Sequence, residues 1–332
     1  MDNTDVIIKK DTLKEVTAPV RDNLSVFRSF FKKEISSDVF LLDQIINYLL
    51  RQKGKEIRPT LVFMTARMFG KVDQRSFIAA TMIELLHTAT LIHDDVVDEA
   101  DKRRGFLSIN KIWRNKAGVL LGDFLLSKGL LIALEYKEYQ LLHVLSDAVK
   151  KMSEGELRQL KTSNLFNMTE DRYFQIISEK TASLISACCQ CGAIAATDDE
   201  TVHTEMKEIG MNIGIAFQIK DDLFDYGIDD IGKPKRNDIR ERKVTLPLIY
   251  ALENSTRAEQ LSVRRVMRKR KKTNGDIDKI VRFVHKKGGL LLAEEKMKQY
   301  TDSALKSLRS LPLISGYDDF EALVNYIVTR KK

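Results

Sequence analysis

The sequence predicts an all-α fold, one large antiparallel bundle of about ten or more helices, and three observations lead to it. Only 5 of the 332 residues are proline, and none lies between Thr60 and Lys233. Apolar residues recur at spacings of three and four along most of the chain, as on one face of an α-helix. Hydrophobic residues make up 43% of the chain, which supports a sizeable core. An all-β fold would need more turn residues, and a disordered chain would be less apolar.

Five helices can be placed from this pattern, in chain order. Residues 40–49 form an apolar stripe, and Gly54 follows it as a stop signal. Residues 83–97 are apolar on most faces, which predicts a deeply buried helix. Further helices are expected over 120–134, 173–196 and 206–224, with breaks at 70–73, 101–107, 164–169, 198–200 and 229–237. Because these breaks are short and none resembles a linker, residues 1–332 are predicted to form a single domain.

The cysteines indicate the compartment. Cys188, Cys189 and Cys191 are almost adjacent, which excludes a disulfide framework and indicates a reducing, cytoplasmic setting. They have no second pair elsewhere in the chain, so they are interpreted as small core residues rather than as a metal site. The first residues lack the apolar core of a signal peptide, and no uninterrupted apolar run reaches the roughly 18 residues of a membrane span.

The net charge of +8 indicates an anionic partner, such as nucleic acid or a small polyanion like a diphosphate. Part of it is local, since seven of the nine residues 264–272 are Lys or Arg. Such a run is most often a solvated helix face, and attraction to an anionic membrane surface is the next interpretation. No aromatic residues interleave with the charges, so no nucleic-acid partner is expected.

The strongest chemical signal is a pair of matched acidic clusters. Asp94 and Asp98 are four residues apart, so their carboxylates share one helix face roughly 6 Å apart along the axis, with Asp95 beside them. Such acids at the end of an apolar helix make sense if a hard divalent cation binds between them, and magnesium prefers carboxylates, waters and phosphate oxygens. The chain then repeats the spacing at a second helix end, with Asp221, Asp222 and Asp225. If the two helices face each other, six carboxylates surround one cavity that binds magnesium ions and, through them, a diphosphate.

Cations lie near these acids in the sequence. Lys55 and Arg58 are three apart at an expected helix start with Pro59 in its first turn, and a helix start is itself an anion site. Others follow the acidic clusters or lie between them: Arg103, Arg104, Lys180 with Thr181, Lys233 and Lys243. Each alone is more often a surface charge. Together with the acids they outline a site for two diphosphates.

With its motifs DDVVD and DDLFD in this order, the chain closely resembles the trans-isoprenyl diphosphate synthases, the polyprenyl synthase family, from about residue 40 to residue 330. The resemblance is to the long-chain type, such as heptaprenyl or octaprenyl diphosphate synthases. It implies a helical bundle of the isoprenoid synthase type with a central cavity, working as a homodimer. It also implies a magnesium-dependent prenyltransferase, with up to three ions, that condenses isopentenyl diphosphate with an allylic diphosphate.

The resemblance also implies roles for residues. Asp94, Asp98 and Asp221 would bind the magnesium ions, and the catalytic set is Asp94, Asp95, Asp98, Asp221, Asp222, Asp225 and Lys180. The allylic-diphosphate contacts would be Arg103, Lys180, Thr181, Gln218, Lys233 and Lys243, and the isopentenyl diphosphate contacts Lys55, Arg58, His87 and Arg104. A histidine in a buried helix is usually a core residue, but His87 lies seven before Asp94, at the position of the family's ligand. His93, next to the acids, is interpreted as supporting them.

Product length is predicted from the residues before Asp94, along which the growing chain would run. Ala89 and Thr90 are small where farnesyl synthases of this family carry bulky aromatic residues, while Leu85 and Leu86 lie one turn further down. Ala133, on the neighbouring helix, leaves more room. A heptaprenyl to octaprenyl product is therefore expected, made on a farnesyl or geranylgeranyl primer for a quinone side chain, with transient contact with a membrane surface at product release.

Some alternatives stay open. One alternative is a short-chain farnesyl or geranylgeranyl diphosphate synthase. Another is a non-catalytic subunit of a heteromeric synthase, which would normally lose one acidic cluster, whereas both are intact here. Terpene cyclases share the first acidic motif but replace the second and lack the Lys55–Arg58 pair. Arg236 and Arg242 stand where the family often has glycines, so the sequence does not decide whether Lys233 or Lys235 contacts the diphosphate.

Overall fold

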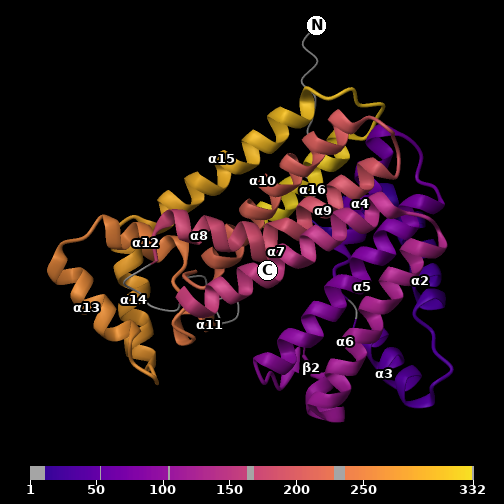
Figure 1. The fold of residues 1–332 in the computed structure, drawn as a ribbon. Helices are drawn as coiled ribbons and strands as arrows, with labels where there is room; N and C mark the ends of the chain where they lie inside the picture. The colour runs from indigo at the N-terminus through magenta and orange to yellow at the C-terminus, as the bar shows by residue number, and fades with distance from the viewer. Residues whose placement is uncertain (1–11, 53, 104, 163–167, 228–235, 331–332) are drawn as a thin grey trace, which may run out of the picture. The chain divides into compact units, whose positions relative to one another are not determined.

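The computed structural model describes residues 12–52, 54–103, 105–162, 168–227 and 236–330, and these are almost entirely α-helical (Figure 1). The predicted all-α class is confirmed. Within the described ranges the only sheet is a two-stranded antiparallel hairpin, in which β1 (Lys102–Arg103) pairs with β2 (Phe106–Leu107). It occupies the predicted loop 101–107, so this break is a hairpin rather than an irregular loop.

The chain divides into two compact units. The first unit comprises Met1–Val149, Ala187–Lys207 and Arg309–Tyr326, and the second comprises Lys150–Ser186, Glu208–Leu308 and Ile327–Lys332. Each is described by itself below, and the expectation that residues 1–332 act as one domain stays a prediction. Five helices have residues in both units: α7 (Tyr139–Thr162), α9 (Ser183–Ile194), α10 (Glu200–Phe224), α15 (Gly289–Arg309) and α16 (Tyr317–Thr329).

The first unit is built around one long buried helix. Its own elements are α1 (Leu13–Val16), the short 3₁₀ helix η1 (Ala18–Val20), α2 (Arg21–Glu34), α3 (Phe40–Arg51), α4 (Ile57–Phe69), α5 (Gln74–Val97) and α6 (Ile109–Glu135). Asp73 caps α5, because its carboxylate accepts the backbone N–H groups of Arg75 and Ser76 at 3.0 and 3.3 Å. Helix α5 packs against α4 and α6, as its apolar faces predict (Figure 1).

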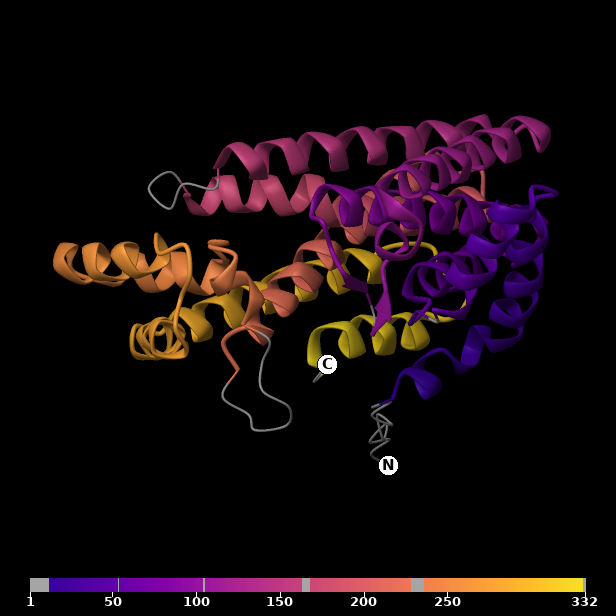
Figure 2. The same ribbon diagram turned by 90° about the horizontal axis from the view of Figure 1, so that it is seen from below.

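The second unit holds the remaining elements. They are α8 (Glu170–Ile177), the π-helical turn η2 (Ser178–Ala182), α11 (Asn237–Arg240), α12 (Leu246–Glu253), α13 (Arg257–Met267) and α14 (Asn274–Lys286). Thr256 and Thr273 start α13 and α14 with reciprocal capping boxes, through Glu259 and Asp276 respectively. Helix α14 packs against both α12 and α13, and Figure 2 shows α13 and α14 in orange.

The helix expected over 173–196 is the one that the structure corrects. It consists of three pieces, α8, η2 and α9, because a π turn inserts an extra residue between two α-helical segments. The other expected helices are confirmed with wider bounds, as α3, α5, α6 and α10. Helix α6 also contains a kink, where Arg114 has a left-handed backbone with φ of 69°.

Two helices of the first unit are long and apolar enough, by length and composition, to cross a membrane. They were not expected from the sequence, because scattered polar residues interrupt every apolar run. In α5, 67% of the most apolar 18 residues are buried inside the protein, as in a core helix. In α6 only 33% are buried, so this helix leaves an apolar surface uncovered.

The three cysteines of α9 are free and buried, and burial raises the pKa of Cys189 to about 12, which confirms the core interpretation.

Candidate active site

The first acidic cluster lies at the C-terminal end of α5, in the first unit. Asp94 is half-buried, Asp95 is 6% exposed and Asp98 is exposed. Asp98 ends the helix, and its backbone N–H donates to the Asp94 carbonyl at 2.8 Å. The last turn of α5 contains no basic residue. Three carboxylates therefore add to the negative end of a 24-residue helix dipole, an arrangement that favours a bound cation.

His93 packs the last turn of α5 against α6. Its Nε2 atom lies 3.3 Å from the Val119 carbonyl oxygen and 3.6 Å from the Asp123 carboxylate. The ring lies directly over Gly122, where an added Cβ would be only 2.1 Å from Nε2. Any larger residue at position 122 would therefore displace the His93 ring from this place beside Val119 and Asp123.

The hairpin after the first cluster is also attached to it. The Asp95 carbonyl accepts the Ala100 backbone N–H at 3.0 Å and the Asn110 amide at 3.0 Å. Ala100 and Asn110 flank the hairpin, and Arg103 lies in its first strand, β1. The Arg103 side chain and Arg104 lie outside the described part of the chain.

The predicted isopentenyl diphosphate residues are all in the first unit. Lys55 is exposed, Arg58 is half-buried at the start of α4, and His87 is buried on α5. Pro59 lies in the first turn of α4, as predicted. Glu56, one of the two residues between these cations, has a left-handed backbone with φ of 51°, and its carboxylate binds the Arg28 guanidinium at 2.7 and 2.9 Å.

The second acidic cluster lies at the end of α10, in the second unit, and hydrogen bonds hold it firmly. Asp222 is 3% exposed and accepts the Tyr173 hydroxyl at 2.7 Å and the Gln218 amide at 2.9 Å. Burial raises its pKa to about 7, although both hydrogen bonds act in the opposite direction. Asp225 accepts the Asp238 backbone N–H at 2.6 Å, and burial together with the Asp238 charge raises its pKa to about 6.

Asp221 is paired with an arginine near the C-terminal end of the chain. Arg330, on the segment after α16, forms an ion pair with its carboxylate. The guanidinium lies over the Phe217 ring at 4.2 Å and near the Phe224 ring at 5.9 Å, and the side chain is 7% exposed. A buried arginine between two aromatic rings thus orients the carboxylate that is predicted to bind metal.

Lys180 and Thr181 lie in the π turn, in a position the sequence did not reveal. The Thr181 hydroxyl donates to the Gln218 side-chain oxygen at 2.8 Å, and Gln218 in turn donates to Asp222. The Lys180 ammonium binds Gln159 at 3.0 Å and forms an ion pair with Glu156. The structure therefore brings Thr181, Gln218 and Asp222 into one hydrogen-bonded chain, and π turns often occur at functional sites.

Lys243 follows α11 and is 44% exposed. It forms ion pairs with Glu241 at 2.9 Å and Asp238 at 3.5 Å, and the hydrogen bond to Glu241 with the charge of Asp238 raises its pKa against the effect of burial. Lys233 and Lys235 lie outside the described residues.

The predicted product-length residues are buried in the first unit. Leu85, Ala89 and Ala133 are 0% exposed and Leu86 is 7% exposed. Thr90 is half-buried, and its hydroxyl donates to the His87 carbonyl at 2.9 Å.

Three residues of this site escaped the sequence analysis: Tyr173, Asp238 and Arg330. Tyr173 is 49 residues and Arg330 109 residues from the acid each one contacts. Nothing in the spacing of the motifs points to them. Across the described ranges, no group of three or more Asp, Glu, His or Cys side chains is close enough together to hold a metal ion.

Comparison with known proteins gives a consistent result. The family model of the polyprenyl synthetases matches residues 39–284. The chain is 33% identical over 306 residues to the octaprenyl diphosphate synthase of Escherichia coli K12, covering 91% of this chain and 93% of the relative. It is 31% identical to heptaprenyl diphosphate synthase component 2 of Bacillus subtilis, covering 99% and 94%. A crystal structure of a Caulobacter crescentus polyprenyl synthase, complexed with calcium and isoprenyl diphosphate, matches with a TM-score of 0.87 and 30% identity, covering 98% and 99%.

Proposed function

Since the chain belongs to the polyprenyl synthetase family, and is a long-chain trans-prenyl diphosphate synthase within it, we propose that it makes a heptaprenyl to octaprenyl product. It condenses isopentenyl diphosphate with a farnesyl or geranylgeranyl primer, and the product supplies quinone side chains. One observation carries the metal-dependent condensation: both aspartate clusters lie at the C-terminal ends of long helices whose last turns contain no basic residue.

The donor set fits magnesium. Hard carboxylate oxygens are the ligands that magnesium prefers, with water and phosphate oxygens completing the octahedron. Asp94, Asp98 and Asp221 would hold up to three ions, and Asp222 and Asp225 are better suited to structural roles, because each is committed to hydrogen bonds within the protein. When bound, the magnesium supplies positive charge to the allylic diphosphate as it departs.

The remaining side chains bind and position the two substrates. Arg103, Lys180, Thr181, Gln218, Lys243 and either Lys233 or Lys235 act on the allylic diphosphate, and Lys55, Arg58, His87 and Arg104 on isopentenyl diphosphate. In this structure Lys180 and Lys243 are paired with acids of their own unit, so each exchanges a carboxylate for a phosphate oxygen when substrate binds. The acidic partners thereby keep both ammonium groups oriented in the free enzyme.

The reaction follows from these positions. The C–O bond of the allylic diphosphate breaks and its electron pair leaves with the diphosphate. The double bond of isopentenyl diphosphate attacks the allylic cation, a C–C bond forms, and the released diphosphate takes the proton. Because no side chain has to act as base, catalysis rests on positioning and charge stabilisation.

The small buried residues before Asp94 support a long product. Ala89 is fully buried on α5, one turn before the acids, and Leu85 follows one turn deeper. A short-chain synthase is the alternative, and a magnesium assay with labelled isopentenyl diphosphate and a farnesyl primer separates the two. Chromatography of the dephosphorylated products should show seven to eight isoprene units, whereas a product that stops at farnesyl or geranylgeranyl length would refute the proposal.

A homodimer is proposed from the exposed face of α6. Leu120, Leu131 and Leu134 are 68%, 50% and 53% exposed, and their spacings of eleven and three place them on one face. A self-complementary apolar face of this kind suits a two-fold interface. The B. subtilis relative is named as one component of a synthase, so the alternative is a heteromeric enzyme. Sedimentation and activity of the isolated chain decide: an active dimer supports the proposal, and an inactive 38.0 kDa monomer supports the alternative.

A cytoplasmic location remains our interpretation of the three free cysteines, which recovery of the enzyme from the cytoplasm, free or released from membranes by salt, would support.

A further inference from the structure

The positive charge of the chain is concentrated in one part of the second unit. Residues 236–287 contain 16 Lys and Arg against six Asp and Glu, a net charge of +10, so the other 280 residues together carry −2. The diphosphate residues assigned above account for little of this excess. Of those described, only Lys243 belongs to the segment.

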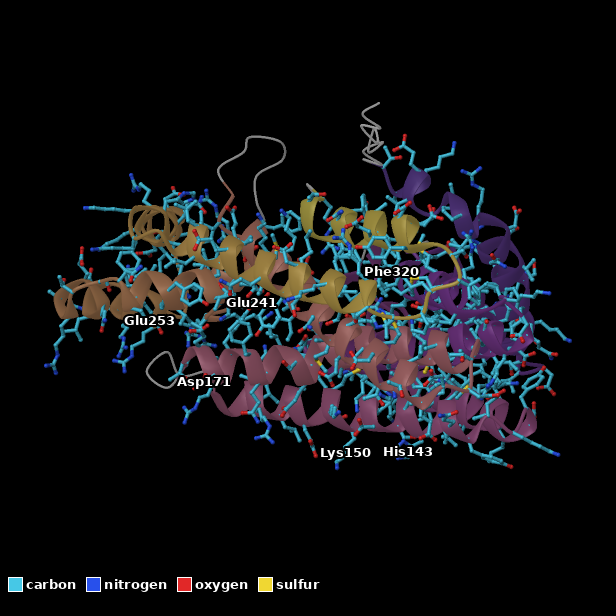
Figure 3. All side chains as sticks on the ribbon, turned by 90° about the horizontal axis from the view of Figure 1, so that it is seen from above. His143, Lys150, Asp171, Glu241, Glu253 and Phe320 are labelled. Carbon is cyan, nitrogen blue, oxygen red and sulfur yellow. The ribbon has the colours of Figure 1, made fainter. Side chains whose placement is uncertain are left out.

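Five of the six acids in this segment already form ion pairs within it. Asp276 pairs with Lys269 at 2.6 Å and Glu259 with Lys287 at 2.8 Å, while Asp278 pairs with Arg236. Glu241 and Asp238 both bind one lysine. The sixth acid, Glu253, is the last residue of α12 and is labelled in Figure 3. Four cations thus pair with five acids, and twelve of the sixteen Lys and Arg residues of the segment lie outside these pairs.

The cations line up on two helix faces. Arg265 of α13 and Arg268, its C-cap, lie four and seven residues after Leu261 and are exposed on the same face. Val263, Val266 and Met267 are buried on the other face. On α14, Lys279, Arg282 and Lys286 are exposed at spacings of three and four. Figure 3 shows nitrogen-tipped side chains projecting outward from these orange helices.

Hydrogen bonds join these faces into one surface. Lys279 donates to Ser262 of α13 at 3.1 Å, which connects the exposed face of α14 to that of α13. Lys272, in the connecting loop, donates to the Arg240 carbonyl of α11 at 3.2 Å. Burial and the charge of Arg242 lower the pKa of Lys272, so the segment after α11 adds like charge to the same surface. Among the described residues, no carboxylate pairs with Arg265, Arg270, Lys271 or Lys286.

We propose that this basic surface, formed by Arg265, Arg268, Arg270, Lys271, Arg282 and Lys286, docks the enzyme on an anionic lipid bilayer. Leu261 is 54% exposed on the same face of α13 as Arg265, so it can enter the headgroup layer. Anionic headgroups attract each Lys or Arg that approaches them. The segment's two aromatic residues, Tyr250 and Phe283, are buried and half-buried, so no exposed ring is present to stack on nucleic-acid bases.

The use of such docking rests on the proposed function. A product of seven or eight isoprene units is an apolar chain that water does not dissolve, while its diphosphate stays ionic. An enzyme resting on a bilayer can release the tail into the lipid, and the basic surface does not itself depend on the length of that tail.

Vesicle sedimentation tests the proposal with the full chain at physiological salt. We expect binding to phosphatidylcholine vesicles that contain 30% phosphatidylglycerol, and at least tenfold weaker binding to pure phosphatidylcholine or in 0.5 M salt. The variant R265Q/R268Q/R270Q/K271Q should lose at least tenfold in binding to the anionic vesicles, and Leu261→Ser a smaller factor. The matched control K32Q/K33Q/K298Q/K306Q removes four exposed lysines elsewhere and should lose less than half of the binding.

Circular dichroism of each variant checks folding, and condensation in detergent, measured separately, tests the proposed function. Activity retained by the basic-surface variant, with vesicle binding lost, supports docking. Vesicle binding by a chain that proves inactive supports docking and refutes the proposed function. Equal loss in the control set, equal binding to neutral vesicles, or tighter binding to duplex DNA than to anionic vesicles would overturn the docking proposal.

Discussion

The ends of α5 and α10 carry the same motif in different surroundings. At the end of α5 the acids run from half-buried Asp94 to exposed Asp98, which caps the helix. At the end of α10, Asp222 is almost fully buried between a tyrosine and a glutamine, and an arginine binds Asp221. Both clusters lie at the negative, C-terminal end of a helix and have the same spacing, so the difference lies in the residues that tertiary structure places around each cluster.

This difference separates two kinds of aspartate. Asp222 accepts two hydrogen bonds in a dry environment, where carboxylate is costly, and burial raises its pKa to about 7. Such a group stiffens the helix end. Asp94 and Asp221 are only partly buried, so water or phosphate oxygens can reach them together with a metal ion. Spacing alone does not distinguish the two roles.

The largest expected effect is on metal-dependent turnover. Asp94→Ala and Asp221→Ala should each lower kcat for condensation by roughly 10³-fold or more, because each removes charge that holds magnesium against the leaving diphosphate. Steady-state assays across a magnesium titration measure this effect. Asp302→Ala, an exposed acid on α15, is the matched control and should retain normal turnover. Near-normal activity in either cluster variant would show that this cluster does not bind catalytic metal.

Much of this comparison was available from the sequence. The spacing of Asp94 and Asp98 predicts a shared helix face, and the apolar run before them predicts a buried helix. Both are confirmed by α5. The partners of Asp221 and Asp222 could not be predicted, because Arg330 and Tyr173 reach them through long-range packing that no local periodicity encodes. The π turn at Lys180 could not be predicted either, because one inserted residue hardly changes the apolar pattern.

A smaller loss of kcat is expected when Arg330 is replaced. This arginine pairs with Asp221, in the cluster at the end of α10. Arg330→Met keeps most of the packing against Phe217 but removes the ion pair to Asp221. We expect a 10- to 100-fold loss of kcat and a higher magnesium requirement, because the carboxylate is no longer oriented. Arg330→Lys should recover part of both, since it restores the charge. An unchanged magnesium requirement in Arg330→Met would show that the ion pair serves stability alone.

A bulky substitution on α5, before the first acidic cluster, should shorten the product with little loss of the condensation rate. Ala89→Phe places a ring one turn before Asp94, so the product should shorten to farnesyl or geranylgeranyl length while the first condensation continues. Ala89→Ser, which adds one oxygen, should leave product length unchanged. Chromatography of dephosphorylated products compares the three enzymes. A long product from Ala89→Phe would mean that the growing chain runs along another helix.

The smallest expected effect is a pH dependence of stability in the metal-free protein, specific to the α10 cluster. Asp222 has a folded pKa of about 7, above its ordinary value near 4, so the native state holds a proton that the unfolded state has released between these values. The stability that Asp222 contributes is therefore fully present below about pH 4 and is lost as the pH rises through about 7. Urea unfolding in chelator should show the free energy of unfolding of the wild type falling over this window relative to Asp222→Asn.

Tyr173 provides the internal check on that assignment. Its hydroxyl donates to Asp222 and lowers the pKa of that carboxyl, so Tyr173→Phe should extend the falling window to higher pH. In the Asp222→Asn background the same substitution should leave the shape of the pH profile unchanged, because no proton remains to be shifted. A Tyr173→Phe profile that moves equally in both backgrounds would assign the titration to another group and remove the electrostatic distinction between the two helix ends.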